Sequence, residues 1–321
     1  MDSKTLVRQQ YSLDAASTEY LAGGGGFSGG ELWRLSFPDD QRLCLRRWAK
    51  AHPTQNRLQF IHQAVAHAAT DSRIPLAVPL RTNSGRSYFE HSGSFWELTA
   101  WLPGVADFSA DPNSERLQQA MHAIARFHLA TQSLKPQTGI PAGASSRLKL
   151  VKEMRATDAD AIHYRLSNLD SPLQMRAARV LAHFRARADE VERQLQAAQL
   201  SFQLQPCLRD LWHDHLLFVG NQLTGIVDYG ALNYESVAAD LGRLLGSILG
   251  DDSSRWTEAL EMYSTIRPLS QPEIQLAKLY DQANIVLSPM NWLRWIILEQ
   301  RQFDDWAAVI QRLDSWISRM P

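Results

Sequence analysis

The sequence predicts an α+β fold of two lobes, with a small β-rich lobe before a larger, mainly helical lobe. The length of 321 residues exceeds the size at which a single core stops growing, roughly 250–300 residues. Hydrophobic residues make up 45% and charged residues 21%, which is typical of a globular protein with a buried core. The apolar pattern changes from strand-like to helix-like near residue 104. We therefore expect lobes over residues 1–100 and 101–321.

The first lobe is predicted to be a mostly antiparallel sheet. Segments 31–37 and 43–48 alternate like strands and are joined by the turn sequence Pro38-Asp39-Asp40, and segment 94–100 is a third strand candidate. One helix is expected from about residue 55 to residue 70. Its buried face would consist of Leu58, Ile61, Val65 and Ala68.

The second lobe is predicted to be helical with one interruption. Helices are expected over 117–131, 172–200, 256–266, 273–287 and 292–320. Between them, the apolar runs 216–219 and 223–227 flank Gly220-Asn221, a pair of turn residues typical of a β-hairpin.

The charge and the cysteine count exclude several classes of protein. The 33 basic and 34 acidic residues give a net charge of −1, so no global attraction to nucleic acid or to an anionic membrane is expected. The longest stretch without a charged residue is 194–208, and a membrane helix needs about 20 apolar residues. The N-terminus lacks the apolar core of a secretory signal. With only Cys44 and Cys207, no disulfide framework is expected, which favours a cytoplasmic protein. The oligomeric state stays open.

A glycine-rich segment at 23–30 is the first candidate site, with six glycines in eight positions. A dinucleotide-binding loop opens a helix, whereas this segment runs into residues that alternate like a strand. The pattern therefore favours a loop that covers phosphates between two strands, because glycines let backbone N–H groups approach phosphate oxygens. A loop without any ligand is the equally open alternative.

Two adjacent arginines end the strand candidate 43–48. Side chains at neighbouring strand positions point to opposite faces, so one of Arg46 and Arg47 can enter a cleft. A guanidinium group there would bridge nucleotide phosphates. We favour Arg46, with Arg47 second, over a strand end with two solvated arginines.

Two aspartates, Asp210 and Asp228, each border an apolar run and stand 18 residues apart. Phosphoryl transfer uses one carboxylate to orient and deprotonate the acceptor hydroxyl and another to hold a metal ion against the phosphates. The segment from Asp210 through the predicted hairpin to Asp228-Tyr229-Gly230 resembles the catalytic segment of aminoglycoside phosphotransferase-like and choline-kinase-like small-molecule kinases. Further segments resemble that family in the same order along the chain: 25–34, 43–48, the inter-lobe hinge 98–104, and the helices at 117–128 and 239–244.

The resemblance implies a protein-kinase-like fold and ATP-dependent phosphorylation of a hydroxyl on a small molecule, with Mg²⁺ as the metal ion and Mn²⁺ as the alternative. By resemblance Asp210 is the catalytic base, Asp228 the principal metal ligand, and Asp240 a brace for the catalytic loop. The implied nucleotide-binding residues are Gly24, Gly26, Phe27, Ser28, Gly29, Arg46, Thr99 and Trp101.

The chain departs from the family pattern at three places. Leu208 stands where a His is usual, and His215 stands where an Asn usually supplies a metal-binding oxygen. His215 is therefore the second candidate metal ligand. The helix at 55–70 has no Glu to pair with the phosphate-binding cation, and its polar residues are Gln59, His62, Gln63 and His67. The alternative function is a kinase-fold protein without efficient chemistry, acting as a nucleotide-binding or scaffold module.

Two other polar clusters favour ordinary structural interpretations. The run His213-Asp214-His215 is a weak zinc candidate, because neighbouring loop residues rarely converge on one ion. Trp292, Trp295 and Glu299 share a helical face, and core packing explains them better than an acceptor surface.

Overall fold

The computed structural model describes residues 2–21, 29–50, 52–303 and 305–320. The chain forms two compact units. The first comprises Met1–Leu134, Trp212–Asn233 and Met262–Arg267, and the second comprises the remaining segments, Lys135–Leu211, Tyr234–Glu261 and Pro268–Pro321. Each unit is therefore built from separated stretches of sequence, and each is described by itself below.

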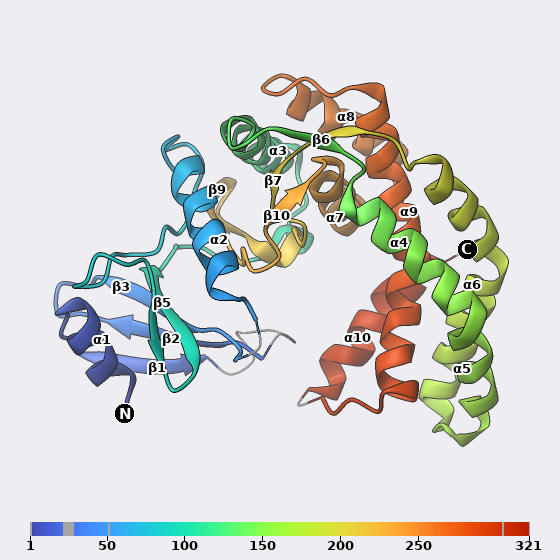
Figure 1. Cartoon of the computed structure of the whole chain (residues 1–321), viewed down its shortest axis with the longest axis horizontal. Coiled ribbons are helices and arrows are strands. Elements are labelled where there is room, and N and C mark those ends of the chain that lie inside the picture. Colours follow the sequence, from blue (N-terminus) through green and yellow to red (C-terminus); the bar gives the residue numbers. More distant parts are fainter. Residues whose placement is uncertain (1, 22–28, 51, 304, 321) are drawn as a thin grey trace. The chain divides into compact units, whose positions relative to one another are not determined.

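A five-stranded antiparallel sheet lies in the first unit (Figure 1). Its order is β1 (Ser17–Leu21), β2 (Glu31–Ser36), β3 (Arg42–Arg47), β5 (Ser94–Ala100) and β4 (Phe89–His91). The three strands predicted from alternation are confirmed. Helix α1 (Ser3–Tyr11) and strand β1 were not predicted. α1 contributes Leu6, Val7 and Tyr11 to the core that contains Leu35, Leu45 and Leu98 from the sheet.

Two long helices belong to the first unit, and the second of them was predicted as part of the second lobe. Helix α2 (Gln55–Ala68) begins at Thr54, whose hydroxyl accepts the Arg57 amide, and it buries all four residues of the predicted face. Helix α3 (Ser114–Thr131) starts three residues before the predicted helix and directly follows the capping residue Asn113. Both helices are confirmed.

The predicted hairpin is also confirmed. Strands β8 (Leu216–Val219) and β9 (Gln222–Ile226) pair through a turn in which Gly220 has φ +58°. Val105 and Phe218 exchange backbone hydrogen bonds of 3.0 and 2.9 Å. At Gly104, with φ +104°, a Cβ atom would lie 2.6 Å from the Phe218 carbonyl oxygen. Only glycine therefore allows the segment after β5 to lie against the hairpin.

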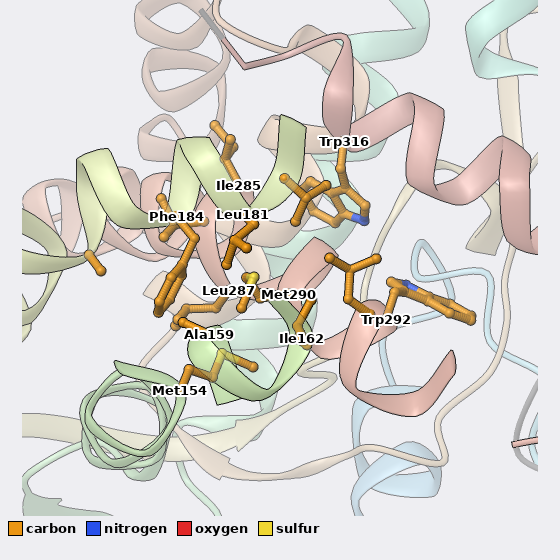
Figure 2. Close-up of a cluster of buried hydrophobic side chains, with 14 of the residues drawn as sticks. Met154, Ala159, Ile162, Leu181, Phe184, Ile285, Leu287, Met290, Trp292 and Trp316 are labelled. Carbon is orange, nitrogen blue, oxygen red and sulfur yellow. The ribbon is translucent and has the colours of Figure 1, made fainter. Parts of the chain in front are cut away.

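Helices dominate the second unit. Its three-stranded sheet has β7 (Phe202–Cys207) between β10 (Asn233–Glu235) and β6 (Gln137–Gly139). The helices are α4 (Ala142–Glu153), α5 (Ala159–Arg165), α6 (Ser171–Ala197), α7 (Ala238–Leu249), α8 (Ser253–Ser264, shared with the first unit), α9 (Gln271–Leu293) and α10 (Trp306–Ile317). Figure 2 shows a core of this unit, a cluster of buried residues that includes Leu181 and Phe184 of α6, Met290 of α9 and Trp316 of α10.

The prediction of one helix over 292–320 is wrong. Helix α9 ends at Leu293 and passes into a π-helical turn, Arg294–Leu298, and α10 begins only at Trp306. Gln300 has φ +50°, a left-handed conformation that ends a helix. Trp292 is buried and its ring lies 5.0 Å from that of the partly buried Trp295, so core packing is confirmed for these two residues, whereas Glu299 is exposed. Among the described residues, no helix is both long and apolar enough to cross a bilayer.

Candidate active site

Arg46 and Asp228 contact each other although 182 residues separate them. The Nη2 atom of Arg46 donates to Oδ1 of Asp228 at 3.0 Å. The Arg46 side chain is largely buried, whereas that of Asp228 is 42% exposed. Arg47 points to the other face of β3 and pairs with Glu31 of β2. Of the two candidate arginines, Arg46 is thus the one beside the predicted metal ligand.

Trp48 fixes the plane of this guanidinium group. The Cζ atom of Arg46 lies 3.8 Å from the centroid of the Trp48 ring, a close cation–π contact. The indole in turn packs against the chain after Asp228, since a Cβ atom at Gly230 would lie 3.2 Å from the Trp48 ring. Glycine at position 230 therefore lets the indole and the Asp228 segment approach closely.

Asp228 has a strained backbone and a perturbed carboxylate. Its φ of +61° is uncommon for a residue with a side chain, and such strain occurs often at functional sites. Burial opposes ionisation of Asp228, but the charge of Arg46, with its hydrogen bond and that of the Gly230 amide, holds the pKa of this carboxyl below its usual value. The group is therefore an anion at neutral pH, as a metal ligand must be.

His215 lies next to Asp228. Its Nε2 atom is 3.8 Å from Oδ2 of Asp228, and the same atom accepts a hydrogen bond of 3.0 Å from Nε1 of Trp212. One carboxylate and one imidazole nitrogen at this separation fit a divalent ion, although an ion on Nε2 has to displace the indole N–H. The donor set suits Mn²⁺ at least as well as Mg²⁺, because imidazole nitrogen is a poorer ligand for Mg²⁺ than oxygen.

Most of the predicted phosphate loop cannot be compared with the structure. Gly24, Gly26, Phe27 and Ser28 lie outside the described residues. Gly29 is described and has φ +74°, a conformation that favours glycine. The nucleotide-binding role of this loop therefore stays a prediction.

The predicted hinge segment begins within β5, and its pairing with β3 continues one residue beyond the end of that strand. Thr99 is paired with Cys44 of β3, and the Trp101 amide donates to the Arg42 carbonyl at 3.1 Å. The Trp101 N–H is thus already engaged, and an adenine ring would have to bind other backbone groups of this segment. The Thr224 hydroxyl donates to the Pro103 carbonyl at 2.6 Å, which ties the hinge to the hairpin.

Asp210 belongs to the second unit and has its own set of neighbours. Its Oδ1 atom lies 3.2 Å from Nε of Arg243 on α7. The loop that carries it is braced by Asp240, which is fully buried and accepts the backbone amides of Leu208 and Arg209 at 2.8 and 2.5 Å. Arg209 has φ +69°, so the chain turns sharply just before Asp210. The bracing contact that the resemblance implied for Asp240 is present.

The family model of the phosphotransferase enzyme family matches residues 25–268, which is more than half of the chain. The chain belongs to the phosphotransferase enzyme family. The predicted family and the predicted phosphotransferase class are thereby confirmed. Among curated proteins, none matches this phosphotransferase.

Solved structures with the same fold span almost the whole chain. A spectinomycin phosphotransferase in complex with ADP and spectinomycin superposes with a TM-score of 0.70 at 10% identity, covering 99% of this chain and 96% of the other. An amicoumacin kinase in complex with AMP-PNP, Ca²⁺ and amicoumacin gives 0.68 at 13% identity, covering 100% and 95%. A microcompartment-associated aminopropanol kinase gives 0.59 at 13% identity, covering 98% and 94%. These likenesses confirm the predicted α+β, kinase-like fold.

Four residues of this phosphotransferase contact the predicted site residues and were missed in the sequence. They are Trp48, Glu97, Trp212 and Arg243. Glu97 carried a signal, because it is the single charged residue in the otherwise uncharged strand 94–100. Trp48, Trp212 and Arg243 carried none that separates them from core or surface residues.

Proposed function

We propose that this phosphotransferase transfers the γ-phosphoryl group of ATP to a hydroxyl of a small molecule, with a divalent metal ion. The observation that carries the proposal is the group of Arg46, Asp228 and His215, in which a guanidinium lies beside a carboxylate and the carboxylate lies beside an imidazole. When bound, the ion neutralises charge on the phosphates and holds them in line for transfer.

Arg46 retains the capacity to bind phosphate. Within the described part of the chain its Nε–H is buried and has no hydrogen-bond partner, and only one Nη2 contact holds it to Asp228. Phosphate oxygens would satisfy the buried donor, and the guanidinium can offer two parallel N–H groups to them. The stacking on Trp48 keeps the plane of the group fixed while its partner changes.

Asp210 would orient and deprotonate the acceptor hydroxyl. The two backbone amides held by Asp240 fix the loop on one side of Asp210, and Arg243 holds one carboxylate oxygen. We propose that the Asp210 carboxylate takes the hydroxyl proton. Because a positioned general base contributes about 10²–10⁴-fold, the loss of this carboxylate should be large but not total.

The relatives suggest the class of both substrates. ADP and AMP-PNP are bound by two of the structural relatives, and the names of the three relatives describe spectinomycin, amicoumacin and aminopropanol as their acceptors. All three acceptors carry hydroxyl and amine groups. We infer an acceptor of this kind, with residues 1–100 as the nucleotide lobe and residues 101–321 as the catalytic and acceptor lobe. The two free cysteines, Cys44 and Cys207, support a cytoplasmic location.

The test is thermal unfolding with ATP in the presence of Mg²⁺, of Mn²⁺ or of EDTA. A ligand at 100 times its Kd stabilises the folded state by about 2.7 kcal/mol. Asp228→Ala should abolish the metal-dependent part of this stabilisation, while Asp14→Ala, which removes an exposed ion pair with Arg8, should keep it. Equal stabilisation of the parent and of Asp228→Ala would show that the site is wrongly assigned.

The acceptor is then sought by ATP consumption with amino alcohols, amino sugars and nucleosides. Phosphorylation of one of them, lost in Asp210→Asn, is the expected result. Metal-dependent ATP binding without transfer to any acceptor would favour the alternative function, a nucleotide-binding module. The hydrogen bond from Trp212 to His215 is the contact that would then explain a weak second metal ligand.

A further inference from the structure

A buried carboxylate, that of Glu97, lies beside Arg46 on strand β5. Helix α2, where a glutamate was expected to pair with the cation, has no carboxylate. Glu97 of β5 is the direct antiparallel partner of Arg46 of β3, so both side chains lie on the same face of the sheet. Only 7% of Glu97 is exposed. Arg46 thus lies between two carboxylates, Glu97 within the sheet and Asp228 after the hairpin.

Glu97 is held by donors from two different elements. Its Oε2 atom lies 2.7 Å from Nε2 of His62 on α2 and 2.9 Å from Nε1 of Trp48. Nδ1 of His62 lies 2.7 Å from the Ser87 hydroxyl, so both ring nitrogens of the histidine are engaged. Since a carboxylate only accepts, the proton on the Glu97 side of the ring belongs to His62.

These contacts form a continuous path to the phosphate-binding cation. His62 orients Glu97, Glu97 fixes the indole N–H of Trp48, and the face of Trp48 carries the Arg46 guanidinium at 3.8 Å. Rotation of the indole would break its bond to Glu97, so the plane on which Arg46 rests is set by that carboxylate. Burial opposes the ionisation of Glu97, but the His62 contact, the charge of Arg46 and the Trp48 bond hold its pKa below the usual value.

We propose that Glu97, oriented by His62 and acting through Trp48, is the positioning residue that aims Arg46 at the nucleotide phosphates. The inference rests on the function proposed above. It assigns to a strand carboxylate and a helix histidine the role that a helix glutamate was expected to fill. When a metal ion takes Asp228, Glu97 remains as the counter-charge of Arg46.

The arrangement is more specific than core packing requires. A buried ionised group is expensive to desolvate, and well-packed apolar residues often stabilise a core as well as a buried ion pair does. Packing alone therefore does not account for a carboxylate at this position, and its register partner on β3 is the cation Arg46.

The test compares ligands that differ only in their phosphates. Binding of adenosine, AMP, ADP and ATP is measured by calorimetry for the parent and for Glu97→Gln, with and without Mg²⁺. In the proposed site Arg46 contacts the phosphates and not the nucleoside. Glu97→Gln should therefore weaken ATP binding at least tenfold and change adenosine binding less than twofold. Glu90→Gln is the matched control, since Glu90 lies on the neighbouring strand β4, is exposed, and loses the same charge.

A second variant keeps the inference testable if Glu97→Gln does not fold. Trp48→Phe retains the Glu97–His62 pair and a ring beneath Arg46, and it removes only the indole N–H. It should lose the same preference for ATP over adenosine, and the double variant should lose little more than either single one. Equal weakening of adenosine and ATP, or unchanged ATP binding in both folded variants, would overturn the role of Glu97. A parent protein that binds no ATP with any metal would instead refute the proposed function itself.

Discussion

Arg46 and a metal ion compete for Asp228, so removal of the arginine should strengthen metal binding in the nucleotide-free protein. The contact is 3.0 Å long and involves one side chain that is 14% exposed and one that is 42% exposed. Two charges about 4 Å apart attract by about 4 kcal/mol at an effective dielectric constant of about 20. Pairs open to solvent are measured at only about 0.2–1 kcal/mol. For this half-exposed pair we take an intermediate value, ~1.4 kcal/mol, which corresponds to a tenfold change in affinity.

Arg46→Met should therefore raise the affinity for Mn²⁺ about tenfold, because the methionine keeps an apolar stem over Trp48 and removes the competing charge. The affinity is measured by the electron paramagnetic resonance signal of free Mn²⁺ in a titration of nucleotide-free protein. ATP binding should change in the opposite direction and become at least tenfold weaker. Arg47→Met removes the same charge from the other face of β3 and should leave both affinities unchanged.

Opposite shifts in one variant cannot arise from general destabilisation, which would weaken both ligands. If Arg46→Met leaves Mn²⁺ binding unchanged, Arg46 does not hold the Asp228 carboxylate in solution. If it also leaves ATP binding unchanged, Arg46 is not the phosphate-binding cation, and the interpretation of the site fails.

Four further variants test the remaining site residues. Asp210→Asn should retain ATP binding and lose turnover on an identified acceptor by at least about 10²-fold; unchanged turnover would remove Asp210 from the role of base. If His215 is a metal ligand, Mn²⁺ binding should weaken as the pH falls through about 6.5, where an ordinary histidine takes up a proton. His215→Asn should flatten that pH profile and restore preference for Mg²⁺. Trp212→Phe should strengthen Mn²⁺ binding by removing the competing N–H. If both variants bind Mn²⁺ as the parent protein does, His215 is not a metal ligand. Asp240→Asn should lower the free energy of unfolding by about 1–3 kcal/mol, measured by urea titration, because one of two buried amides loses its ionised acceptor. Its turnover should fall with unchanged ATP affinity, and parent-like turnover would show that the loop does not depend on this brace.

The sequence predicted the elements whose apolar residues follow one clear period. Helix α2 and the hairpin β8–β9 belong to this group, because one has a continuous buried face and the other has Gly220-Asn221 between two apolar runs. The helix predicted over 292–320 failed for the opposite reason. Its apolar spacing continues past Gln300, so the sequence pattern gives no sign of an end there. In the structure the left-handed backbone at Gln300 separates the two helical segments.

The sequence predicted individual residues of the site, but it did not predict the contacts that connect them. Asp228 and Arg46 stood out because each borders an apolar run, and the structure brings them into contact. The contribution of Glu97 could not be derived from its own segment. It depends on the register between β3 and β5 and on the turn of α2 that faces the sheet, and both are set by tertiary packing.

The discontinuity of the first unit has a consequence for how this chain reaches its folded state. Leu76 pairs with Ile226, the Ala77 amide donates to the Tyr229 hydroxyl, and Arg57 donates to the carbonyls of Ala231 and Leu232. During synthesis, residues 1–134 leave the ribosome about eighty residues before segment 212–233, the next part of the same unit. Pairing of such distant segments closes large loops and is slow. The sheet that carries Arg46 is therefore synthesised before the hairpin segment 212–233, and the side of the first unit that contacts this segment is exposed in the meantime. We expect this interval to be the step at which the nascent chain is most exposed to aggregation and to chaperone binding.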